Sequence, residues 1–106
     1  MRWLLPILCL LAGSACSPCS QSCRQEAAAF DECLDGWGLG WADLGARDRN
    51  DFRDQCIVDN KSYVRSLDTE LRRAEEGLCA DLAHSLRIAN DCDSAWAALT
   101  EYGLAP

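Results

Sequence analysis

Apolar residues recur every three or four positions along most of the chain, which is the period of an α-helix. Alanine and leucine are abundant, whereas valine, isoleucine and threonine are scarce. No stretch alternates apolar and polar residues long enough to predict a strand. The pattern therefore predicts an all-α fold, a small bundle of three or four helices.

The first predicted helix begins after Pro18, near Ser20, and runs to about Asp35, where a glycine-rich loop extends from Gly36 to Arg49. Cysteines and aromatic residues recur at helical spacing along one side of this helix, and this side should face the core: Cys19, Cys23, Phe30, Cys33 and Trp37. The acidic residues of the same helix show no catalytic signature and are predicted to form a solvated face: Glu26, Asp31, Glu32 and Asp35.

A second helix, capped by Asp48 or Asn50, should hold Phe52, Cys56 and Ile57 on one side. No glycine or proline interrupts residues 51–76, yet one helix continuing to position 90 would be about 60 Å long, too long for a domain of this size. The turn-like composition of residues 59–62 places the break within 59–66.

The third predicted helix runs from about Leu67 to Ala89 and carries the cleanest apolar stripe of the chain: Leu67, Leu71, Ala74, Leu78, Leu82 and Leu86. Residues 90–93 form a predicted turn. A short last helix, capped by Asp93 or Ser94, then contains Trp96 and Leu99 and ends at Gly103.

Residues 1–15 follow a different pattern. Arg2 precedes an apolar run from Trp3 to Ala12, and small residues then lead into Cys16. A positive start, an apolar stretch too short to span a bilayer and small residues at its end predict an export signal. With Gly13-Ser14-Ala15 directly before Cys16, the segment resembles the signal of bacterial lipoproteins.

The resemblance implies a signal peptide over residues 1–15 and a mature domain over 16–106 whose first residue, Cys16, carries lipid. The membrane partner would then be reached through an acylated Cys16. Under bacterial sorting rules, Ser17 in the next position favours an outer rather than an inner membrane. The expected location is therefore the cell envelope, with plain secretion as the alternative.

The number of cysteines is consistent with lipidation of Cys16, because it leaves an even number for disulfides. Of eight cysteines, Cys9 leaves with the signal and Cys16 carries the lipid, so six remain to form three disulfides: Cys19, Cys23, Cys33, Cys56, Cys79 and Cys92. These six allow fifteen pairings. We expect Cys33 to join Cys56 across the loop, and Cys19 and Cys23 to pair with Cys79 and Cys92 in either order.

Charge excludes some partners. All seventeen acidic residues follow position 16, against nine basic ones, so the mature domain carries a net charge of about −8. Such a balance argues against nucleic acid and against electrostatic adhesion to anionic lipid. Membrane attachment would therefore depend on the acyl chains.

Candidate catalytic and metal-binding patterns are weak. Cys16-Ser17-Pro18-Cys19 has the Cys-x-x-Cys form of redox enzymes, but no βαβ pattern surrounds it. His84 is the only histidine and could serve as a general base, but no triad order accompanies it. Neither the cysteine spacing nor the acidic residues near position 50 complete a zinc or calcium motif, so we predict no metal and no cofactor.

Trp37 and Trp41 flank Gly38-Leu39-Gly40 in the predicted loop. Such tryptophans can form a surface that binds a carbohydrate or a protein partner, or they can plug the open end of a helical bundle, which is the more common role in a small domain.

The sequence thus predicts a small exported lipoprotein with a noncatalytic binding or scaffolding role and an unspecified ligand. Two alternatives remain: a periplasmic thiol-disulfide or other small enzyme that uses Cys16 and Cys19 or His84, and a freely secreted disulfide-rich factor.

Overall fold

The computed structural model describes residues 17–106, so the predicted signal peptide and Cys16 lie outside the described residues. This part of the chain contains the α-helices α2 (Pro18–Cys33), α3 (Arg49–Ser66), α4 (Thr69–Ile88) and α5 (Cys92–Glu101), and a short 3₁₀ helix, η2 (Trp41–Leu44). No strand occurs between residues 17 and 106, which confirms the predicted all-α class.

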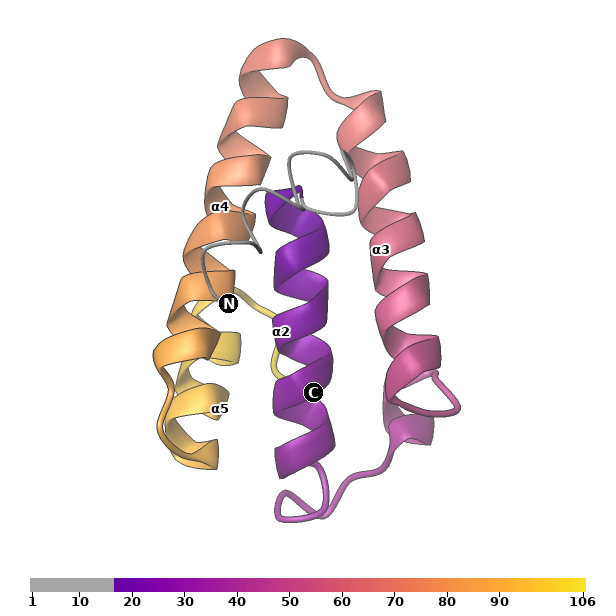
Figure 1. Ribbon diagram of the computed structural model, residues 1–106, viewed down its shortest axis with the longest axis vertical. Coiled ribbons are helices and arrows are strands. Elements are labelled where there is room, and N and C mark those ends of the chain that lie inside the picture. The colour runs from indigo at the N-terminus through magenta and orange to yellow at the C-terminus, as the bar shows by residue number, and fades with distance from the viewer. Residues whose placement is uncertain (1–16) are drawn as a thin grey trace, which may run out of the picture.

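Helix α2 is the centre of the domain. It lies between α3 and α4 and also contacts α5, as Figure 1 shows. Ser17 caps its first turn by accepting a hydrogen bond from the backbone N–H of Ser20 at 3.2 Å, and Pro18 fills the first helical position, where no donor is needed. Helices α3 and α4 contact α2 much more than they contact each other.

One disulfide joins α2 to each of the other three described α-helices. Cys19 bonds to Cys79 of α4, Cys23 to Cys56 of α3, and Cys33 to Cys92 of α5. All six cysteines of the described part of the chain are therefore paired with one another.

The predicted Cys33–Cys56 bond is wrong, and so is the predicted pairing of Cys23 with Cys79 or Cys92, because Cys23 bonds to Cys56. The Cys19–Cys79 bond is one of the predicted pairs. Helix α3 runs antiparallel to α2 (Figure 1), and Cys56 lies seven residues into it. At 1.5 Å per residue, Cys56 is therefore about 10 Å beyond the turn between the two helices. Cys23 lies ten residues, about 15 Å, from the same end of α2, so Cys56 is closer in height to Cys23 than to Cys33. Cys33 ends α2 at the turn and bonds to the start of α5 instead.

The turn that follows α2 closes at a glycine. Gly38 adopts a φ of 72°, and the N–H of Leu39 donates to the carbonyl of Leu34 at 2.9 Å. This left-handed conformation, which glycine adopts without strain, reverses the chain after α2. The loop predicted from Gly36 to Arg49 follows, with η2 inside it.

The predicted break between Asp59 and Ser66 is wrong, because α3 continues through Ser66. The amide of Asn60 donates to the carbonyl of Cys56 one turn earlier, so this residue is accommodated inside a helix. The stronger signal is Asp68, which accepts a hydrogen bond from the N–H of Leu71 at 2.9 Å and starts α4.

The last helix begins earlier than predicted. Asp91 is its N-cap and accepts from the N–H of Ser94 at 2.7 Å, so Cys92 lies in the first turn rather than in a preceding loop. Its end is close to the prediction: the helix stops at Glu101, and Gly103 has a φ of 72°.

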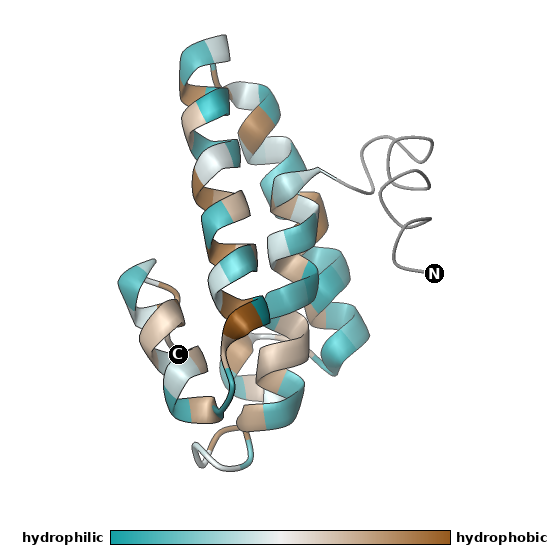
Figure 2. Cartoon of the chain, turned by 60° about the vertical axis from the view of Figure 1, so that its left-hand side comes forward, coloured by the Kyte–Doolittle hydropathy of each residue, from teal (hydrophilic) through white to brown (hydrophobic). Residues whose placement is uncertain are grey.

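The hydrophobic core occupies the end of the bundle where α2, α4 and α5 meet, and Phe30 and Leu99 are fully buried there. The predicted α4 stripe is only half buried, because Leu82 and Leu86 join the core while Leu71 and Leu78 are more than half exposed. Figure 2 shows apolar segments continuing along the α3–α4 hairpin beyond this core. No helix among the described residues has both the length and the hydrophobicity needed to cross a bilayer.

We predict that Leu99→Ala lowers the free energy of unfolding by about 3 kcal/mol, because the removed side chain is fully buried and leaves a cavity. Leu71→Ala, the same change at a 55% exposed position, should cost roughly 0.5 kcal/mol or less. Urea unfolding with the disulfides intact measures both. Equal losses would contradict this assignment of the core.

Candidate functional site

A half-open cavity of about 480 Å³ lies between α3 and α4. Ser22 and Glu26 of α2 contribute to it, and the disulfide cysteines Cys56 and Cys79 lie in its two walls. Further apolar and aromatic side chains line the cavity: Leu44, Phe52, Leu78, Leu82, Tyr102 and Leu104. Polar side chains from α3 and α4 also line it: Gln55, Asp59, Asn60 and Glu75. The cavity thus combines apolar surface with a comparable number of polar groups.

The chain end shapes one side of the cavity. After α5, the N–H of Leu104 donates to the carbonyl of Leu99 at 2.8 Å, and that of Gly103 donates to Thr100 at 3.0 Å. This paired ending turns the chain at Gly103, where φ is positive. It places Tyr102 and Leu104 at the cavity.

Glu26 is the buried acidic residue of this cavity, with only 7% of its surface exposed. One of its carboxyl oxygens, Oε2, lies 3.8 Å from Cys56 Sγ. A disulfide sulfur carries no proton, so it cannot donate a hydrogen bond to a carboxylate. Within residues 17–106, no N–H or O–H group donates to the carboxyl group of Glu26. Its ionised form is therefore unpaired.

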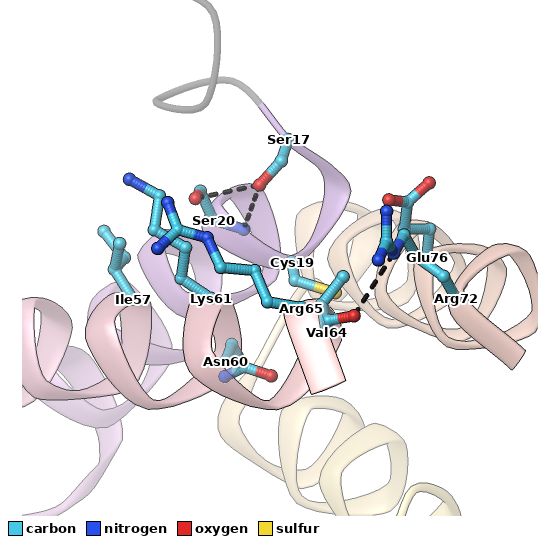
Figure 3. A pocket seen from close by; sticks show the side chains of 10 residues that line it. All are labelled: Ser17, Cys19, Ser20, Ile57, Asn60, Lys61, Val64, Arg65, Arg72 and Glu76. Atoms are coloured by element: carbon cyan, nitrogen blue, oxygen red, sulfur yellow. Dashed lines mark hydrogen bonds between the residues drawn. The ribbon is translucent and has the colours of Figure 1, made fainter. Parts of the chain in front are cut away.

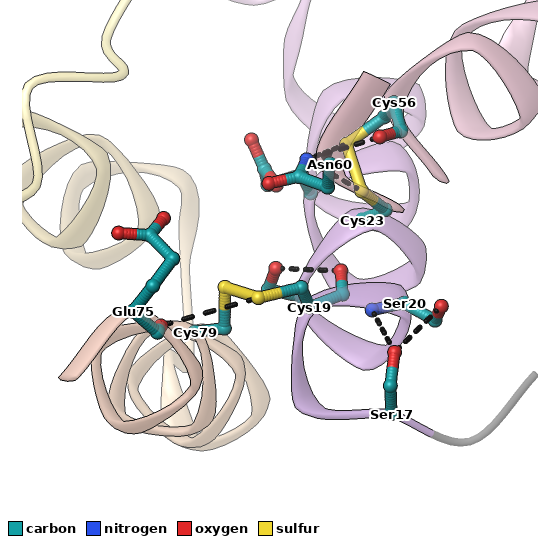
Figure 4. The surroundings of a disulfide bond; sticks show 10 residues. Ser17, Cys19, Ser20, Cys23, Cys56, Asn60, Glu75 and Cys79 are labelled. Carbon is teal, nitrogen blue, oxygen red and sulfur yellow. Dashed lines mark hydrogen bonds between the residues drawn. A yellow bond between two sulfur atoms is a disulfide. The ribbon is translucent and has the colours of Figure 1, made fainter. Parts of the chain in front are cut away.

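Asn60 lies beside the same disulfide but does not serve Glu26. Its Nδ2 donates to the backbone carbonyl of Cys56 at 3.0 Å and lies 3.3 Å from Cys23 Sγ. Figure 4 shows Asn60 over the Cys23–Cys56 bond, with Glu75 and the Cys19–Cys79 bond on the side of α4. The Asn60 amide therefore donates to the backbone of α3 and lies against the disulfide, and it does not pair with Glu26.

Burial raises the pKa of Glu26 from 4.5 to about 7. Removal of water penalises the charged form, and no basic side chain lines the cavity to compensate. Glu26 therefore changes charge near neutral pH.

The cavity brings Glu26, Cys23 and Cys56 together, with one possible ligand atom from each within 4.8 Å of the others. Both sulfurs belong to the same disulfide, and metal ions bind thiolates. In the oxidised domain this cluster offers a single carboxylate rather than a three-ligand metal site.

A second, smaller hollow of about 220 Å³ lies near the start of α2 (Figure 3). Lys61, Arg65 and Arg72 line it. Arg72 donates to the carbonyls of Val64 and Leu67, each at 3.2 Å, so it closes the end of α3. Arg72 therefore has a structural role at the α3–α4 turn.

Trp37 and Trp41 are half-buried at the end of the bundle. Trp37 packs edge-on against Phe30 and Trp96, with ring centroids 6.3 and 4.9 Å apart, and Trp41 packs against Phe52 at 6.0 Å. These contacts are the ones expected if both tryptophans close the end of the bundle. Each also keeps some exposed surface, and binding of a partner there remains a prediction.

The residues named for the alternative function, an enzyme, do not form a catalytic site among residues 17–106. Cys19 is bonded to Cys79, so it is not available to form a Cys16–Cys19 dithiol. His84 is exposed on α4, and none of the described residues forms a hydrogen bond or ion pair with its imidazole ring.

The assignment of Glu26 to a solvated face is wrong. Asp31, Glu32 and Asp35 are exposed as predicted, but Glu26 is buried. The position of Glu26 in the sequence indicated this burial, because it lies three residues after Cys23 and four before Phe30 on the core-facing side of α2.

The fold and cavity define a small, all-α, disulfide-stabilised domain. Comparison of the chain with known family models, curated proteins and solved structures finds no match.

We predict that Glu26→Gln stabilises the domain above neutral pH. Because the folded pKa lies above the unfolded one, the wild-type protein binds more protons when folded, and its stability falls as pH rises from about 4.5 to 7. Relative to the variant, the wild type should lose roughly 2 to 3 kcal/mol between about pH 5 and 8.

Urea unfolding at several pH values measures this difference. Glu32→Gln is the matched control, since Glu32 is exposed on the same helix and its neutralisation should leave the pH dependence unchanged. A wild type and a Glu26→Gln variant with parallel pH profiles would contradict the burial of Glu26.

Proposed function

We propose that the chain is a small exported lipoprotein whose disulfide-stabilised domain has a noncatalytic binding or scaffolding role in the cell envelope. The observation that carries the proposal is the complete pairing of the six cysteines from Cys19 to Cys92. Disulfides of this density are typical of oxidising compartments, which supports export.

The pairing also bears on Cys16. Since each of the other six cysteines has its partner within the domain, none is left to bond with Cys16. An exported protein with a free thiol at its first residue would be open to oxidation and disulfide exchange. A thioether to lipid removes that reactivity and accounts for the odd cysteine.

The start of the fold suits an anchor at Cys16. Ser17 is already the N-cap of α2 and Pro18 its first helical residue. An anchored Cys16 would therefore hold the domain directly against the membrane, because one residue spans less than about 4 Å. The α3–α4 turn extends beyond the start of α2 at the same end of the bundle in Figure 1, so it would then face the lipid surface.

Binding is favoured over catalysis by the chemistry that the cavity offers. Its one buried ionisable group, Glu26, has no histidine or free thiol beside it in the cavity. Ser22, which also lines the cavity, donates its hydroxyl to the carbonyl of Cys19 at 2.9 Å rather than to Glu26, so no nucleophile and base pair forms. A half-open apolar cavity with a single buried carboxyl suits recognition of a ligand.

We predict that the mature protein, produced in a bacterium that processes lipoproteins, begins at an acylated Cys16. Intact-mass measurement and labelling with an alkyne-bearing fatty acid test this directly. The Cys16→Ser variant is the control and should lose both the label and the membrane association while its three disulfides still form.

An unlabelled protein recovered from the medium would favour the freely secreted factor and overturn the anchor. A solvent-reactive thiol pair that includes Cys19 would favour the enzyme.

A further inference from the structure

We propose that the cavity between α3 and α4 binds a small organic cation, a primary ammonium group on an apolar body, with the carboxylate of Glu26 as its counter-ion. The proposal deepens the binding role proposed above by naming a ligand class, and it rests on that role.

The first argument is charge. Each of the three long helices contributes one acidic residue to the cavity: Glu26 from α2, Asp59 from α3 and Glu75 from α4. None of the residues that line the cavity is lysine, arginine or histidine. A concave site whose charges have a single sign concentrates ligands of the opposite sign, so this one selects cations.

The second argument is the state of Glu26. It is more than nine-tenths buried, and its carboxyl oxygen faces a disulfide sulfur at 3.8 Å rather than a donor. An ionised carboxylate in such a place lacks the partner that buried charges normally have. An ammonium group supplies three donors and a compensating charge in one step.

The third argument is the rest of the lining. Phe52, Leu78 and Leu82 offer apolar surface, and Tyr102 and Leu104 extend it at the chain end. At about 480 Å³ the cavity falls within the range of small-molecule sites. The apolar body of an amine can bury surface here, and the rings of Phe52 and Tyr102 also attract cations.

The same lining argues against a metal ion as the occupant. Calcium takes six to eight oxygen ligands, and magnesium requires near-octahedral coordination. Glu26 is the only carboxyl group of the cavity that is buried, whereas Asp59 is exposed and Glu75 half-buried. One deep carboxylate among leucines and aromatic rings suits an ammonium group with an alkyl chain.

Hexylamine is the probe, and NMR titration of the complete domain with intact disulfides at about pH 8 is the measurement. Its ammonium group remains protonated there, as a lysine side chain does. We expect saturable shifts at residues that line the cavity. Hexan-1-ol, which lacks the charge, should bind about tenfold more weakly or worse, and hexanoate should not bind.

The variants locate the counter-ion. Glu26→Gln should weaken hexylamine binding about tenfold or more, and wild-type affinity should fall by a similar factor between about pH 8 and 5.5, as Glu26 takes up its proton. Glu32→Gln removes the same charge from an exposed position on α2 and should leave the affinity unchanged.

Four outcomes would overturn the proposal: no binding of hexylamine by the folded domain, equal binding of hexylamine and hexan-1-ol, unchanged affinity in Glu26→Gln, or calcium binding that displaces hexylamine. The anchor is tested separately. If the protein is acylated but does not bind hexylamine, only the cation site is contradicted. If it binds hexylamine but carries no lipid, only the anchor is contradicted.

Discussion

The structure depends on one helix that is covalently joined to every other. Helix α2 carries three cysteines, and each bonds to a different partner helix at sequence separations of 60, 33 and 59 residues. Closing loops of this length restricts the unfolded chain and stabilises a fold by roughly 3 to 4 kcal/mol per bond. For a domain with a core confined to one end, such contributions are comparable to its whole stability.

This architecture explains how a cavity can persist in so small a protein. Because Cys19–Cys79 and Cys23–Cys56 fix α4 and α3 separately to adjacent turns of α2, the two outer helices need little direct contact with each other. The space between them stays open above Glu26. A bundle held by packing alone would close that space, because hydrophobic burial is its main stabilising interaction.

Local signals in the sequence predicted much of the fold. Helical periodicity predicted the all-α class, Gly38 marked the turn after α2, Gly103 marked the end of α5, and Asp48 marked the start of α3. The misplaced break shows the limit of composition, because Asn60 satisfies its amide inside α3 while the cap at Asp68 decides the boundary. Periodicity alone also could not reveal that Leu71 lies beyond the reach of the other helices and stays exposed.

The site was harder to predict than the fold, because it depends on how helices align rather than on what each contains. The disulfide between Cys23 and Cys56 follows from the antiparallel register of α2 and α3, which no spacing within either helix specifies. Glu26 had the right periodicity to be buried but the wrong chemistry for a core, so its charge argued for solvent. Its burial follows from its position between Cys23 and Phe30 on the side of α2 that faces the other helices.

Mapping the disulfides of the unreduced protein by trypsin digestion tests the central role of α2 most directly. The account predicts that residues 25–47 are released bonded to residues 88–106 alone. It also predicts that the peptide ending at Arg24 holds both 54–61 and 74–87, and fragmentation should assign Cys23 to the first and Cys19 to the second. Recovery of residues 25–47 bonded to 54–61 would contradict it.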